Sequence, residues 1–222
     1  MRSSVSLRRS ARCCWARSAR PWPANCASQE SGMQAYASNI LAVVYTDGLA
    51  ADKFLAGWGY ALRDAGFSVA GLVQLNTFER DPGKCDMAIE ELYSGTVLQL
   101  SEDRGKEARG CRLDRSVLTQ AAGLLLSALE QRPDILVLNK FGKVEAEGEG
   151  LRDALAKAVE LDVPIVVGVP FRNLDQWRIF AGDLAEECPV NSVQLQRWLQ
   201  ARNLLPEQGR PIGEAATGWA TH

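Results

Sequence analysis

The sequence predicts an α/β domain of three layers, with a mostly parallel open sheet and helices on both of its faces. Continuous apolar runs rich in β-branched residues, such as ILAVVY at 40–45, are typical of buried parallel strands. Segments with helical periodicity alternate with these runs, as in strand–helix–strand units. The chain has 222 residues and is 46% hydrophobic, which is enough for one core of this kind.

The first half of the domain is predicted to begin with one strand–helix–strand unit. The run at 40–45 leads through a turn to a helix over 49–65, which Gly66 ends because glycine favours the position after a helix. A second strand follows, and then less regular segments with a short helix and a further strand. These last three elements are expected over 67–75, 86–93 and 96–100.

The second half is predicted to hold another strand–helix–strand unit between two helical stretches. Its elements are a helix over 115–131, a strand over 135–138, a helix over 148–161 and a strand over 163–169. Two closing helices are expected around 174–187 and 192–202. We therefore expect a basic leader over 1–38, a single α/β domain over 39–202 and a loose tail over 203–222.

The net charge of −2 averages two unlike parts of the chain. Residues 1–32 hold six arginines and one acid, which gives +5, and the remainder carries −7 from 19 bases and 26 acids. The leader is expected to be disordered or untranslated, with translation starting at Met33 rather than Met1. An organellar transit peptide and a phosphate-binding basic arm are the alternatives.

Composition excludes several classes of function. The single histidine is the last residue, His222, so mechanisms with an internal histidine base or histidine metal ligand are excluded. No apolar run reaches the about 18 residues of a membrane span, and the acidic body argues against nucleic-acid binding. The cysteines show no C-x-x-C spacing, so we expect a reduced cytoplasmic protein with no zinc site.

Ligands of parallel α/β sheets bind beyond the carboxyl ends of the strands, which draws attention first to the turn after residue 45. Asp47, Gly48 and Lys53 are the candidate ligand-binding residues there. If Lys53 is aligned with the lysine of the phosphate-loop pattern G-x-x-x-x-G-K-[ST], Asp47 and Asp52 stand where the glycines belong and Phe54 where the hydroxyl belongs. An ordinary strand-to-helix turn with a surface lysine is the alternative.

The segment after the strand at 135–138 is denser in candidates. Asn139, Lys140, Gly142 and Lys143 are predicted to bind an anionic ligand, and Glu145 is the candidate catalytic residue, which orients a water or binds a cation. A surface loop of ion pairs explains the same charges.

Cys111 is a third candidate, because an arginine on each side favours the thiolate. An ordinary buried cysteine is the alternative interpretation.

Several stretches resemble a bacterial family of domains of unknown function, over about residues 39–185. They are GLVQ at 71–74, RGCRLD at 109–114, NKFGKVEAEG at 139–148 and GLR at 150–152. That family is similar to the small, thermophile-type P-loop nucleoside-triphosphatases, and some members are associated with molybdenum-transport genes. In those enzymes the third strand ends in an Asp-Glu pair followed by Ile-Gly-Lys-Met-Glu. This chain has Asn-Lys followed by Phe-Gly-Lys-Val-Glu.

The resemblance implies the fold and a binding site at the strand ends, without the acidic pair and the phosphate-loop residues that magnesium-dependent hydrolysis needs. Our hypothesis is a degenerate P-loop-like module that binds a nucleotide or an oxyanion with little or no hydrolysis. The alternatives are a regulatory or protein-interaction domain, with a protein partner or a second copy of the chain, and an enzyme that uses Lys140 or Lys143 as a nucleophile. The sequence does not identify a cofactor.

Overall fold

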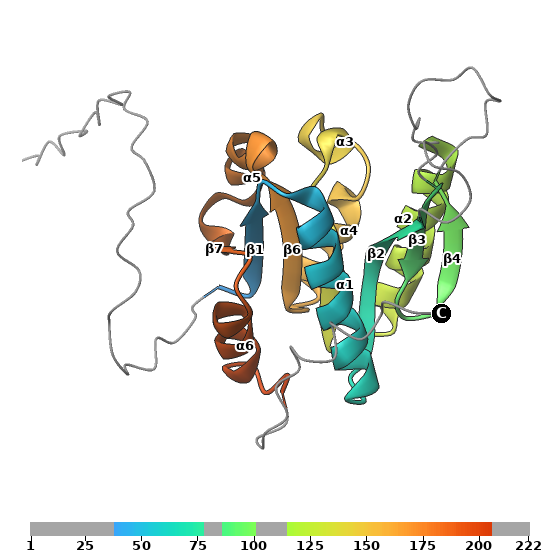
Figure 1. Ribbon diagram of the computed structural model, residues 1–222. Helices are drawn as coiled ribbons and strands as arrows, with labels where there is room; N and C mark the ends of the chain where they lie inside the picture. Colours follow the sequence, from blue (N-terminus) through green and yellow to red (C-terminus); the bar gives the residue numbers. More distant parts are fainter. Residues whose placement is uncertain (1–37, 78–85, 101–114, 206–222) are drawn as a thin grey trace, which may run out of the picture. The chain divides into compact units, whose positions relative to one another are not determined.

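The computed structural model describes residues 38–77, 86–100 and 115–205, and these form a seven-stranded sheet with helices on both faces (Figure 1). The leader over 1–37, residues 78–85, the segment 101–114 that contains Cys111, and the tail over 206–222 lie outside the described residues. The predicted domain boundaries therefore stay predictions.

The strands lie in the order β4-β3-β2-β5-β6-β1-β7. Five of them run parallel: β2 (Val69–Thr77), β5 (Ile135–Leu138), β6 (Ile165–Pro170), β1 (Ile40–Tyr45) and β7 (Ala185–Pro189). Beyond β2 the sheet continues with two antiparallel strands, β3 (Asp86–Glu91) and β4 (Thr96–Gln99). The predicted mostly parallel α/β sheet is confirmed.

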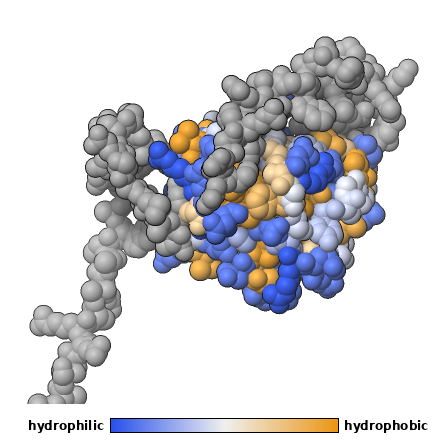
Figure 2. Space-filling view, turned by 90° about the horizontal axis from the view of Figure 1, so that it is seen from below, coloured by the Kyte–Doolittle hydropathy of each residue, from blue (hydrophilic) through white to orange (hydrophobic). Residues whose placement is uncertain are grey.

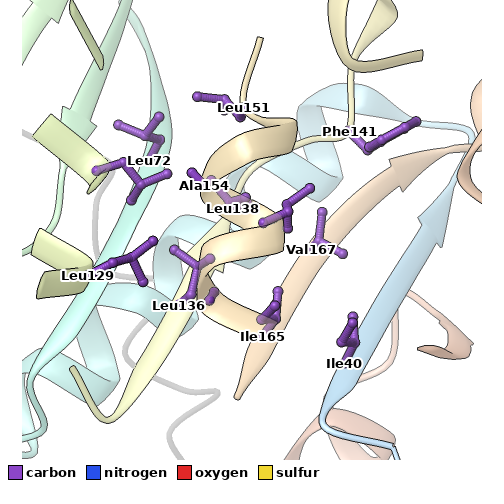
Figure 3. Packing of buried hydrophobic residues seen from close by; sticks show 14 of the residues in the cluster. Ile40, Leu72, Leu129, Leu136, Leu138, Phe141, Leu151, Ala154, Ile165 and Val167 are labelled. Carbon is purple, nitrogen blue, oxygen red and sulfur yellow. The ribbon is translucent and has the colours of Figure 1, made fainter. Parts of the chain in front are cut away.

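Two hydrophobic clusters hold the helices against the two faces of the sheet. One face packs against α1 (Gly48–Asp64) and α6 (Ser192–Gln200), and the other against α2 (Arg115–Glu130), α4 (Arg152–Glu160) and α5 (Leu174–Ala181). Strand alternation divides the residues between the clusters: Leu136 and Leu138 of β5 face α2 and α4, whereas Ile135 and Val137 face α1. Figure 3 shows part of the first cluster, in which Leu136, Leu138 and Ile165 point toward the helix that carries Ala154.

Two predicted helices are wrong. The segment predicted as a helix over 86–93 forms β3, because its backbone pairs antiparallel with β2 from Leu72 to Thr77. The helix predicted over 174–187 ends at Ala181, where Gly182 takes a φ of +55°, and the chain continues through the turn η2 (Gly182–Leu184) into β7, which pairs with β1. The predicted end of the first helix is confirmed, since Gly66 has a φ of +94° just after α1.

The strand order creates a point where neighbouring connections run in opposite directions. From β1 the chain passes through α1 to β2, beyond β6 and β5, whereas from β6 it passes through η1 (Phe171–Asn173), α5 and η2 to β7 on the other side of β1. Ligands of open α/β sheets bind at such a point, beyond the carboxyl ends of the strands. In Figure 1 these ends are the arrowheads of β1 and β6, beside the start of α1.

Candidate functional site

Three segments surround the carboxyl ends of β1, β5 and β6, and we call them together the strand-end region. They are residues 45–53 at the end of β1 and start of α1, residues 139–142 after β5, and residues 171–173 after β6. Hydrogen bonds tie the last two together, because the Phe141 amide N–H donates to the Gly168 carbonyl at 2.7 Å and the Asn173 side chain donates to the Phe141 carbonyl at 3.0 Å. The Phe141 ring also packs edge-on against Trp177, with ring centres 5.2 Å apart.

The amino end of α1 is capped by the protein's own carboxylate. Asp47 takes the N-cap position, and its side chain accepts a hydrogen bond of 3.1 Å from the Ala50 amide. Gly48 is the first residue of α1 and is exposed, as is Lys53 in the second turn. In phosphate-binding loops the free N–H groups of the helix end receive the anion. The charge of Asp47 opposes an anion at this position.

The charges of Asp52 in α1 and Arg172 in η1 both act on the hydroxyl of Tyr45, the last residue of β1. Tyr45 is buried, and burial is the main cause that raises the pKa of its hydroxyl well above the usual range; the charge of Asp52 adds to this rise and that of Arg172 opposes it. Asp52 is also buried, with 6% of its surface exposed. The sequence interpretation missed Tyr45 and Arg172 as members of the site, although both stand at strand carboxyl ends, where the general rule for α/β sheets would have found them.

Asn139 has the environment that is hardest to explain by folding alone. Its side chain is 94% buried, and neither the oxygen nor the nitrogen of its amide has a hydrogen-bond partner. Its backbone is firmly held: the N–H donates to the Leu72 carbonyl at 2.9 Å, and its own carbonyl lies so close to β6 that a Cβ at Gly168 would be 2.1 Å from the oxygen. By strand alternation, its side chain follows Ile135 and Val137 on the face that α1 covers.

Lys140 is partly buried next to Asn139. Its Nζ donates a hydrogen bond of 2.7 Å to Oε1 of Gln74, a residue of β2. The contact holds one ammonium group at the carboxyl end of β5. The ligand-binding role predicted for Lys140 and Asn139 stays a prediction.

Glu145 and Gly142 are joined to each other. Glu145 lies in the short helix α3 (Lys143–Ala146) with 5% of its surface exposed, and its two carboxylate oxygens accept hydrogen bonds from the Gly142 amide at 2.8 Å and the Leu151 amide at 3.1 Å. A Cβ at Gly150, where φ is +71°, would lie 2.3 Å from one of these oxygens. These contacts give Glu145 a structural role in closing the loop, and its predicted catalytic role stays a prediction.

Lys143 points away from this arrangement. Its side chain is 82% exposed and its Nζ lies 3.6 Å from a carboxylate oxygen of Glu147, four residues later. This is the surface ion pair that the sequence left open as an alternative, and such pairs contribute little to stability.

A cavity of about 400 Å³ lies at the other end of the strands, near the amino ends of β1, β6 and β7. Most of its polar lining is occupied by internal contacts: Ser38 donates to the Leu184 carbonyl and to Glu186, and Asp162 accepts from Asn39. Figure 2 looks onto this end of the domain and shows apolar and hydrophilic residues interspersed. The cavity therefore offers fewer unused polar groups than the strand-end region.

The described residues contain neither a cluster of metal-ligating side chains nor a membrane-spanning helix. No three residues of the types His, Cys, Asp or Glu gather there in a way that fits a metal ion. In that same part of the chain, no helix combines the length and apolar character that crossing a membrane requires.

Comparison with known families decides the relationship that the resemblance suggested. Residues 40–198 match the family described as "Protein of unknown function (DUF2478)", which is well over half of the chain. The chain belongs to this family. The DUF2478 match begins with the first residue of β1 and ends within α6, so it contains all three segments of the strand-end region.

The chain is also similar to a protein that is named for its activity. The Molybdenum import ATP-binding protein ModC 2 of Bradyrhizobium diazoefficiens is 28% identical over 190 residues, which are 78% of this chain and 21% of the relative. The chain thus spans about a fifth of the length of the curated relative it matches. The name of this relative states molybdenum import and ATP binding, and both are said of that protein. No solved structure matches the chain significantly.

Proposed function

We propose that this domain binds a nucleotide or an oxyanion at the strand-end region, with little or no hydrolysis. The observation that carries the proposal is the buried amide of Asn139 with no hydrogen-bond partner. Leaving a buried polar group unsatisfied costs about 1–3 kcal/mol, and native proteins keep few such groups without a use for them. A ligand that pairs with the amide would recover this free energy.

Charge supports an anionic group on the ligand. Lys140 and Arg172 stand on the two segments after β5 and β6, which the hydrogen bonds of Phe141 and Asn173 join. The name of the relative includes ATP binding, which makes adenine nucleotides the first ligands to test. Hydrolysis is not favoured, because the position of the acidic pair holds Asn139 and Lys140. Among the described residues, no three side chains that could ligate a metal gather together.

Calorimetric titration with ATP, ADP, phosphate and molybdate, each with and without magnesium, tests the proposal. We expect one of them to bind below millimolar concentration, and release of phosphate from ATP to stay near the uncatalysed rate. Lys140→Gln should weaken that ligand by about ten-fold or more, since hydrogen bonds to charged groups are worth about 1.5–3 kcal/mol. The matched control Lys157→Gln removes a lysine that pairs with Glu160 on α4 and should leave the affinity unchanged. Failure of all four ligands to bind would refute the proposal.

The alternatives from the sequence stay predictions. Neither a protein partner nor a lysine-dependent reaction has a specific contact among the described residues in its favour, and the cytoplasmic location is likewise an expectation.

A further inference from the structure

The amide of Asn139 has a chemical property that separates the two ligand classes left open above. It offers two N–H donors and one carbonyl acceptor side by side, and all of them are without partners. A deprotonated oxyanion offers only acceptors. It could pair with the N–H groups, but it would leave the carbonyl oxygen buried and unsatisfied.

A nucleobase edge satisfies both kinds of group at once. Adenine, for example, carries an exocyclic amino donor next to a ring-nitrogen acceptor, and asparagine pairs with such an edge through two hydrogen bonds. We infer that Asn139 recognises the donor–acceptor edge of a nucleobase, so that the ligand is a nucleoside or nucleotide rather than a bare oxyanion. The inference rests on the proposed function, because it names the ligand class for the same strand-end region.

The surroundings of Asn139 set the geometry of this contact. Its carbonyl lies against Gly168 of β6 and its N–H is bonded to Leu72 of β2, so the backbone cannot turn away from the sheet. Both amide atoms are covered in this structure. The base therefore reaches them only after side chains over the strand end move. Leu55 of α1 lies on the same face of the sheet, since a Cβ at Gly168 would be 2.6 Å from it.

Two ligands that differ by one amino group test the inference. Adenosine has the exocyclic donor, and purine riboside is the same nucleoside without it. On the wild-type domain we expect adenosine to bind about ten-fold more tightly than purine riboside, the worth of one hydrogen bond whose loss leaves a buried acceptor unpaired.

The variant Asn139→Leu completes the test, because leucine has nearly the shape of asparagine and no polar atoms. It should bind both nucleosides equally and more weakly than the wild type binds adenosine. The control Asn39→Leu changes an asparagine whose amide is bonded to Asp162 and Arg202 at the other end of β1, and it should keep the preference for adenosine.

The outcomes separate this inference from the proposed function. If phosphate or molybdate binds as tightly as ATP and the two nucleosides bind equally to the wild type, the inference is overturned and the proposed function stands. If Asn139→Leu still binds adenosine more tightly than purine riboside, the inference is also overturned, because another residue then recognises the amino group of the base. If neither nucleosides, nucleotides nor oxyanions bind, the proposed function fails and the inference fails with it. The nucleoside comparison on the wild type keeps the test decisive even if the variant does not fold.

Discussion

Replacing Glu145 by glutamine tests whether this residue holds the loop after β5 together or belongs to a reaction centre. Each of its carboxylate oxygens accepts one backbone hydrogen bond, a partly buried one from Gly142 at 2.8 Å and a buried one from Leu151 at 3.1 Å. Glutamine has a single acceptor oxygen, so one of the two N–H groups must face an amide NH₂ group. The loss of one buried partner costs about 1–3 kcal/mol.

The size of the effect can be converted to a melting temperature. In domains of 150–250 residues, 1 kcal/mol corresponds to about 2–4 °C, so Glu145→Gln should lower the melting temperature by between about 2 and 12 °C. Thermal and urea unfolding followed by circular dichroism would measure it. Glu147→Gln is the matched control, because Glu147 is half exposed and pairs with the exposed Lys143, and its change should stay within about 0.5 kcal/mol.

The prediction includes a binding result. At temperatures where the variant is folded, Glu145→Gln should bind the ligand of the wild type with similar affinity. If the variant is as stable as the wild type but no longer binds ligand, the structural role of Glu145 is refuted and the carboxylate belongs to the site.

Three further predictions concern the start of α1, the packing of β6 and the buried ionisable groups. Asp47→Asn keeps a good N-cap but removes a negative charge from the start of α1, so stability should hold while ATP affinity rises about five-fold in calorimetry; unchanged or weaker binding would place the anion elsewhere. Gly168→Ala puts a methyl group 2.1 Å from the carbonyl oxygen of Asn139 and should cost about 1–3 kcal/mol in urea unfolding, whereas wild-type stability would show that the two segments are not so close. Burial raises the pKa of Cys188 to about 12 and also raises the pKa values of Tyr45 and Tyr60. Because these groups ionise first in the unfolded chain, stability should be level up to about pH 8 and fall above about pH 9, and a level urea midpoint through pH 10 would contradict this.

The sequence contained enough information for the parallel part of the sheet but not for its edges. The run ILAVVY at 40–45 can only be buried on both sides, so β1 was predictable. The segment that forms β3 has apolar residues at a spacing that a short helix also fits, and its pairing with β2 decides the outcome. In β7 only Ala185, Cys188 and Pro189 are apolar. An edge strand with so few apolar residues has no alternating pattern, so its sequence is easily taken for the end of the preceding helix.

The candidate site was predictable in position and only partly in detail. The rule that ligands bind at strand carboxyl ends located Asn139 and Lys140, and the structure places both there. Glu145 stands three residues after Gly142, which is the spacing of a side chain that reaches back to a helix start, so one of its two contacts had a local signal. Its second contact, with Leu151, depends on how the loop folds, and no local pattern predicts it.

The most direct test of the central claim is the melting temperature of Asn139→Leu and of the wild type, each with and without ATP. If the amide of Asn139 is kept for a ligand, the variant without ATP should melt at the same temperature or higher, because an unsatisfied polar group has been replaced by an apolar one. Saturating ATP, at about 100 times its dissociation constant, should stabilise the wild type by about 2.7 kcal/mol, and a variant that binds ATP ten-fold more weakly by only about 1.4 kcal/mol. A variant that melts lower than the wild type and keeps the full response to ATP would contradict the claim.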